Sequence, residues 1–253
     1  MPNHIANLIT LRGDEKRIAG VREQLRYQED GLGSLDFNKL IPMPKSLEIE
    51  EGSNTTNAIR LYVTAVDPNI TWLNPNHKMA EKDFLELQKA LDGKQPFPSY
   101  DALLARISEE QIPSLLELGK QAVENQQQYG ATTWYHWSIQ NWGIKWNSYG
   151  GYGNRVCEKN QFLFFTAWSE PEPVIQKLSE QYPEIEFHHQ WADEDYGYNL
   201  GEKTYRAGVV LEENQIEEGT ISAKEFAAWL FGDEDTELSQ VLDEDMDGMQ
   251  QFS

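Results

Sequence analysis

Apolar and polar residues alternate along several short segments of the chain, and this pattern predicts β-strands. The first such segment is HIANLITL at 4–11. The run FLFFTAW at 162–168 is almost continuously apolar, which is typical of a central strand. In all, strands are expected over 4–11, 35–40, 59–66, 144–149, 162–168, 184–191 and 204–211.

Apolar residues recur at three- and four-residue spacing between these segments, which predicts helices. Asp14 is the expected N-cap of the first helix, and Gly143 is expected to end the helix that begins after Thr133. Helices are expected over about 14–29, 79–92, 101–127, 134–142 and 171–182, with a last amphipathic helix around Phe226, Trp229 and Leu230.

The order of these elements predicts the fold class. A first β-α-β unit is followed, after an irregular and helical stretch, by the order α-β-β-α-β-β. This order predicts an α+β fold, a ferredoxin-like antiparallel sheet with helices packed on one face. We expect this domain over 1–211 with a helical insertion at about 79–130, and an acidic C-terminal helix and tail over 212–253.

Charge is distributed unevenly along the chain. The net charge is −21, and residues 169–253 alone hold 22 acidic and 4 basic residues. Because this third of the chain repels a phosphate backbone, direct nucleic-acid binding is disfavoured and a basic protein is the better partner. A local basic patch around Lys145, Arg155 and Lys159 is the alternative by which nucleic acid would bind.

The cellular setting follows from features that the chain lacks. No apolar run approaches the ~18 residues that span a membrane. The N-terminus has no basic segment followed by an apolar one, so no secretory signal is visible. A single cysteine, Cys157, excludes an internal disulfide and disfavours a Cys-rich zinc site. These features predict a soluble protein of a bacterial cytoplasm with no cofactor.

An aromatic cluster at 134–152 is the most distinctive segment. It holds four tryptophans: Trp134, Trp137, Trp142 and Trp146. Such a cluster builds a core or forms a stacking platform. Helical spacing places Tyr135, Ile139 and Trp142 on one face, which favours a core and leaves Trp134 or Trp137 exposed.

Several polar side chains are candidates for a ligand or partner surface. Lys145 and Asn147 flank Trp146, either lining a groove or lying in solvent. Asp193, Glu194 and Asp195 follow the strand that carries His188 and His189. Adjacent strand residues point to opposite faces, so the two histidines do not chelate one ion and no metal site is predicted.

The acidic tail contains a motif that resembles the start of a calcium loop. Residues 243–248 read DEDMDG, the D-x-D-x-D-G pattern of an EF-hand. The loop requires a bidentate glutamate at its twelfth position, and the sequence ends at the eleventh, Ser253. The motif therefore favours a solvated acidic tail.

Four motifs together resemble a known family. They are DFNKLIPMP at 36–44, WYHWSIQNWGIKW at 134–146, FLFFTAWSEPEPVI at 162–175 and WADEDYGYNLG at 191–201. The chain resembles the YubB-like family of bacterial proteins over about residues 1–211. The resemblance implies a ferredoxin-like domain and carriage on plasmids and phages, and it implies no reaction and no catalytic residues.

These observations lead to one favoured function and two alternatives. We expect a non-enzymatic interaction protein of a mobile genetic element, which binds a basic host protein through its acidic surface in counter-defence or DNA mimicry. The first alternative is a small-ligand-binding protein or enzyme that uses a cleft near 134–152. The second is the local basic patch described above.

Overall fold

The structure is a computed structural model that describes residues 2–27, 34–66, 111–150 and 155–233. The chain divides into two compact units. Residues 1–42 and 138–253 form the first unit, and residues 43–137 form the second.

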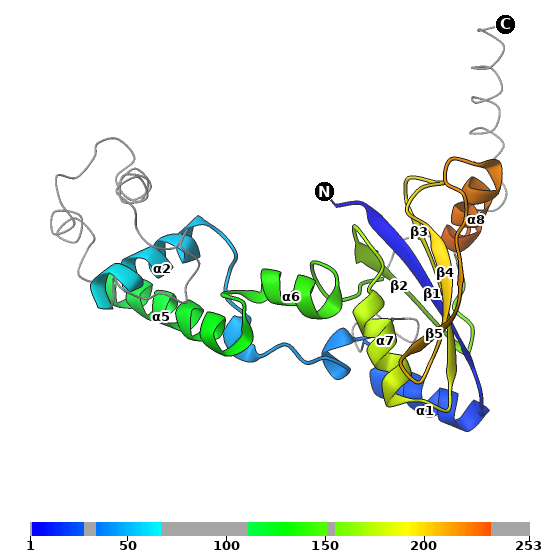
Figure 1. The fold of residues 1–253 in the computed structure, drawn as a ribbon, viewed down its shortest axis with the longest axis horizontal. Helices are drawn as coiled ribbons and strands as arrows, with labels where there is room; N and C mark the ends of the chain where they lie inside the picture. The colour runs from blue at the N-terminus through cyan, green and yellow to red at the C-terminus, as the bar shows by residue number, and fades with distance from the viewer. Residues whose placement is uncertain (1, 28–33, 67–110, 151–154, 234–253) are drawn as a thin grey trace, which may run out of the picture. The chain divides into compact units, whose positions relative to one another are not determined.

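A five-stranded antiparallel sheet forms the centre of the first unit (Figure 1). The strands lie in the order β2-β1-β3-β4-β5. Their bounds are β1 His4–Arg12, β2 Gln161–Ala167, β3 Glu186–Asp193, β4 Gly201–Arg206 and β5 Val209–Asn214. This sheet and its helices confirm the predicted α+β, ferredoxin-like class.

Two helices cover one face of the sheet: α1 (Glu15–Leu25) and α7 (Glu172–Gln181). Asp14 caps α1 as predicted, because its carboxylate accepts hydrogen bonds from the backbone amides of Lys16 and Arg17. The covered face carries large buried side chains at alternate positions of the strands. They include Ile5, Ile9, Leu11, Phe162, Phe164 and Phe187.

The third helix of this unit, α8 (Ile221–Phe231), packs against the opposite face of the sheet. Its buried side chains contact Ala6, Leu8, Phe165 and Ala192, which alternate with the residues of the first face. Thr220 caps α8 through its hydroxyl, and Gly232 ends it in the left-handed region. The expected C-terminal helix is therefore a layer of the domain, and β5 runs through residue 211. The predicted domain limits stay a prediction.

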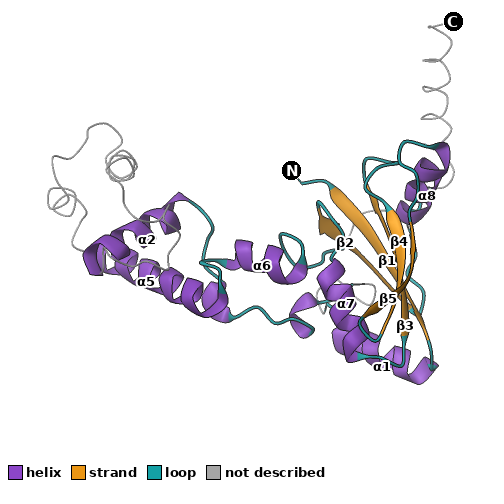
Figure 2. Ribbon diagram, in the orientation of Figure 1, coloured by secondary structure: helices purple, strands orange, loops and turns teal. Residues whose placement is uncertain are grey.

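The second unit contains a pair of helices, α2 (Ser53–Val66) and α5 (Gln111–Tyr129) (Figure 2). They pack closely at Gly119, where an added Cβ would lie 2.1 Å from the carbonyl oxygen of Ala58. The short 3₁₀ helix η2 (Lys45–Leu47) is tied to α5 by Asn125, whose amide donates to the carbonyl of Ser46 at 2.7 Å. The helix predicted over 79–92 lies outside the described residues.

Three predicted strands are wrong. Residues 35–40 form the 3₁₀ helix η1 (Phe37–Lys39), because the Asp36 carboxylate accepts from the amide of Asn38 and turns the chain. Residues 59–66 belong to α2, since their apolar positions fit a helix as well as a strand. Residues 144–149 contribute one bridge, from Tyr149 to Phe165.

Two other predicted strands differ in place or number. The run at 162–168 becomes β2, an edge strand rather than a central one. It is apolar throughout because both of its faces are covered. The last strand predicted over 204–211 is a hairpin of β4 and β5, with Ala207 and Gly208 in the left-handed region at the turn.

Candidate functional site

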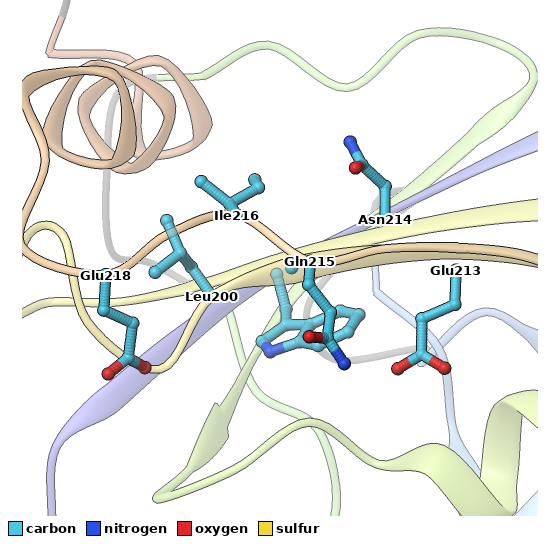
Figure 3. A pocket seen from close by; sticks show the side chains of 8 residues that line it. Leu200, Glu213, Asn214, Gln215, Ile216 and Glu218 are labelled. Atoms are coloured by element: carbon cyan, nitrogen blue, oxygen red, sulfur yellow. The ribbon is translucent and has the colours of Figure 1, made fainter.

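A pocket of about 270 Å³ lies beside the end of β5 (Figure 3). It is lined by Trp191, Leu200, Gly201, Glu213, Asn214, Gln215, Ile216 and Glu218. Figure 3 shows that Glu213, Gln215 and Glu218 extend to one side of the segment, while Asn214 and Ile216 extend to the other. The pocket thus combines two carboxylates with an amide.

The indole of Trp191 supplies the aromatic wall of this pocket. Trp191 on β3 is paired with Gly201 on β4, and the ring occupies the space where a side chain of Gly201 would lie. Its neighbour on the same face is His189, whose ring centroid lies 5.2 Å away. Because Gly201 has no side chain, the ring can approach the β4 backbone closely beside the pocket.

A cluster of charged side chains adjoins the pocket. The Lys203 ammonium lies 3.0 Å from the Glu172 carboxylate, 3.7 Å from that of Glu213 and 5.7 Å from the centroid of the Trp191 ring. Burial lowers the pKa of Lys203, but the hydrogen bond to Glu172 and the nearby carboxylates outweigh burial and raise it. Burial raises the pKa of Glu170 in the same cluster. One lysine therefore lies among three carboxyl groups, and the cluster keeps a negative charge while they are ionised.

Glu218 is held at the rim of the pocket by the turn that follows β3. Its carboxylate accepts a hydrogen bond of 2.8 Å from the backbone amide of Asn199, a residue in the left-handed region with φ 44°. The Asn199 side chain in turn donates to the carbonyl of Trp168 and to Asp193. These hydrogen bonds hold the Glu218 carboxylate in place at the rim of the pocket.

The predicted acidic residues fall into two groups. Asp193 is buried, and its carboxylate accepts from the side chains of Asn3 and Asn199 and from the backbone amide of Asp195. This pattern is typical of a residue that organises a turn. Glu194 and Asp195 are exposed, so they contribute negative charge to the surface.

The aromatic side chains of the 134–152 segment differ in burial from the prediction. In α6 (Trp134–Trp142), Trp137 and Trp142 are buried, Trp134 is half-buried, and Ile139 is 41% exposed. The stripe predicted through Ile139 is therefore wrong. Of the pair Trp134 and Trp137, one of which was expected to be exposed, Trp134 is the more exposed. The Trp142 indole donates to the carbonyl of Ile41, which satisfies its one polar atom inside a packed environment.

Lys145 and Asn147 have separate roles in the structure. The Lys145 ammonium lies 4.5 Å from the ring centroid of Trp146 and 4.9 Å from that of Trp168. Asn147 accepts from the backbone amide of Phe37 at 2.9 Å and donates to Asp36 at 2.8 Å. Asn147 is half-buried, and its side chain joins its own segment to residues 36–37.

The predicted basic patch does not consist of three solvated cations. Arg155 stacks on Trp229 at 3.8 Å and donates to the backbone carbonyl of the same residue. Lys145 lies against the two indoles described above. Of the three residues, Lys159 is the one with an exposed side chain.

The two histidines point to opposite faces of the sheet, as predicted. His188 is hydrogen-bonded to Thr204, and burial lowers its pKa. His189 is fully buried, its Nε2 lies 3.0 Å from Oδ1 of Asn7, and burial lowers its pKa to about 3. Within the described part of the chain, no three His, Cys, Asp or Glu side chains converge as metal ligands. The DEDMDG motif lies outside the described residues.

Sequence reasoning missed the pocket because its walls come from three separate segments. The predicted last strand ended at 211, two residues before Glu213. The pairs Glu212-Glu213 and Glu217-Glu218, on either side of a polar turn, could have indicated an acidic site. The contact of Trp191 with Gly201 depends on the pairing of β3 with β4, which the sequence does not show.

A family model agrees with the ferredoxin-like class of this fold. Residues 141–232 match the family described as the ferredoxin-like domain in Api92-like protein. The crystal structure of the protein Api92 from Yersinia pseudotuberculosis is similar to 87% of this chain and 100% of that chain, with 14% identity and a TM-score of 0.38. No curated protein matches. The implied ferredoxin-like domain is confirmed, and the YubB-like assignment stays a prediction.

None of the helices in the described ranges is both long and apolar enough to cross a bilayer.

Proposed function

We propose that this chain is an interaction protein that binds a basic protein partner through the acidic surface around β5. The pocket formed by Trp191, Glu213 and Glu218 carries the proposal. A pocket with two carboxylates, and with the 8% exposed Trp191 indole in its wall, suits a lysine or arginine side chain, because the carboxylates and the ring quadrupole both attract a cation.

The charge distribution supports this choice of partner. Residues 186–231, which run from β3 to α8, hold ten acidic and three basic residues, a net charge of −7. Glu212, Glu217 and Glu218 are exposed, and the side chain of Glu213 is 49% exposed. A surface of this kind steers a basic partner toward it and repels nucleic acid, with an effect that falls as salt screens the charges.

The proposal extends to the biological role. A protein that presents carboxylates to a basic surface competes with nucleic acid for that surface. The role that we propose is therefore DNA mimicry in counter-defence, by a protein carried on a mobile genetic element. Its setting is the bacterial cytoplasm, where the partner would be a host protein that binds nucleic acid. The measurement that tests this role is whether the chain displaces DNA from a DNA-binding host protein.

The test is a pair of double variants of equal net charge. Glu213→Gln with Glu218→Gln removes the pocket carboxylates and keeps the amide oxygen that accepts from Asn199. Glu117→Gln with Glu124→Gln removes two exposed carboxylates of α5. With a lysine-rich peptide as the probe, we expect the pocket variant to bind about tenfold more weakly and the α5 variant to stay within about twofold.

The outcomes separate specific from general attraction. Equal weakening of both variants would mean that the peptide responds only to total charge, and the pocket proposal would then be abandoned. Absence of binding by the unmodified chain at low ionic strength would overturn the function itself. A shift of labelled DNA by the chain at low salt would favour the basic-patch alternative.

A further inference from the structure

The outer edge of β5 is open. β5 is the last strand of the order β2-β1-β3-β4-β5, and among the described residues no strand or bridge pairs with its far side. The opposite edge differs, because Tyr149 exchanges two backbone hydrogen bonds with Phe165 of β2. Backbone donors and acceptors along an open edge are available to another chain.

The side chains of β5 do not close this edge. All six residues are exposed, and Val209, Val210 and Leu211 are exposed by 59%, 41% and 52%. Edge strands are commonly protected by charged side chains, above all lysine, by proline or by a β-bulge. VVLEEN has neither lysine nor proline; its two charges are glutamates, and its pairing with β4 shifts register at Thr204/Tyr205. An open edge with exposed aliphatic residues is suited to strand addition.

The charges of β5 define the added strand. Glu212 is paired with Thr204 and Glu213 with Lys203, so the two carboxylates point to opposite faces of the sheet. Adjacent residues of an added strand also point to opposite faces. Two consecutive basic residues would therefore each meet one carboxylate. The basic residue opposite Glu213 would lie on the face of the sheet that carries Trp191.

We infer that the β5 edge accepts an extended segment of the partner as a sixth strand. This segment has two consecutive basic residues opposite Glu212 and Glu213, and apolar residues opposite 209–211. The inference rests on the proposed function and adds the mode of binding. A second copy of this chain is the less suitable occupant, because each copy carries a net charge of −21 and two glutamates on this strand.

The decisive probe is a blocked peptide of sequence Thr-Lys-Lys-Val-Val-Val, which matches β5 in length and places its lysines opposite the glutamates in an antiparallel pair. A second peptide of identical sequence carries N-methyl groups at alternate residues, on the side that would donate to β5. It keeps every side chain and charge. We expect the first peptide to bind at least about tenfold more tightly and to slow hydrogen exchange at Val209–Asn214.

Two variants of the chain give an independent readout. Leu211→Lys places a positive charge on the edge, and Val156→Lys makes a comparable aliphatic-to-lysine change at a residue that is 82% exposed and belongs to no strand. We expect Leu211→Lys to weaken binding of the first peptide by about tenfold and Val156→Lys to change it by less than about twofold.

The outcomes distinguish this inference from the proposed function. Equal binding of the two peptides, without protection of β5, overturns strand addition and leaves charge-driven binding in place. Loss of all binding at low salt overturns both. A dimer in sedimentation that dissociates in Leu211→Lys shows that a second copy occupies the edge, and it also overturns the inference.

Discussion

The indole of Trp191 lies so close to Gly201 that a Cβ at Gly201 would be 2.7 Å from Cζ2 of the ring. The two residues are cross-strand partners on β3 and β4. The glycine therefore determines where the aromatic wall of the pocket lies, because any side chain at this position would displace the ring.

Gly201→Ala should displace Trp191 and destabilise the protein. We expect a loss of about 1–3 kcal/mol in the free energy of unfolding, as for other overpacked sites, together with a change in tryptophan fluorescence. Gly20→Ala is the matched control, since a Cβ there meets nothing within 4 Å and should stabilise α1 by about 0.5–1 kcal/mol. A Gly201→Ala protein as stable as the unmodified chain would contradict the assigned contact.

His189→Gln should reduce the dependence of stability on pH. Burial lowers the pKa of His189 from 6.5 to about 3, so between these values the unfolded chain binds a proton that the folded chain excludes. Acidification through this window therefore destabilises the folded state, by up to about 1.4 kcal/mol per pH unit from this one group.

The measurement is urea unfolding at several pH values from 7 down to 4. The His189→Gln variant should lose less stability per pH unit than the unmodified chain. His136→Gln, at an exposed position of α6, should follow the unmodified chain. Identical slopes for the unmodified chain and His189→Gln would show that the folded state accepts the proton.

Asn147→Ala should lower stability without affecting the binding of a basic peptide. The change leaves the backbone amide of Phe37 without the side-chain oxygen that accepts from it, at a cost of about 1–3 kcal/mol. Asn147→Asp should be destabilising at neutral pH, because a second carboxylate then faces Asp36, and less so in acid. Weaker peptide binding by a folded Asn147→Ala protein would restore this residue to the binding surface.

Gly119→Ala should separate α2 from α5 in the second unit. An exposed helical glycine gains about 0.5–1 kcal/mol on change to alanine, whereas here the added methyl would meet the backbone of Ala58. We expect a net loss of at least about 1–3 kcal/mol, with faster hydrogen exchange in both helices. Stabilisation similar to that of Gly20→Ala would show that the helices are not in this close contact.

The strands β1 and β3 were predictable because their side chains alternate between two faces, and β2 because its residues are almost all apolar. Phe187, His189 and Trp191 point to one side of β3, and His188 points to the other, as period-two alternation requires. The short segments failed where local hydrogen bonding decided the backbone. Asp36 turns residues 37–39 into a 3₁₀ helix, and the left-handed pair Ala207 and Gly208 divides one predicted strand into two.

The candidate site was less predictable, because proximity in the fold decides it. Of the residues singled out in the sequence, Asp193 and Asn147 form hydrogen bonds with residues distant in the chain, and Trp137 is buried. Glu213 and Glu218 gained their importance from neighbours on other segments. Charge density indicated the acidic third of the chain and not the two carboxylates that border its pocket.

The sequence by itself determined the α+β class, the N-cap of α1 and the net negative charge of the chain, because these depend on periodicity, local capping and composition. Tertiary structure alone decided that β2 and β5 lie at the edges, that α8 forms a layer on the second face, and that Trp191 meets Gly201. Each of these depends on which distant segments pair, and pairing is set by the packing of the whole domain rather than by any one segment.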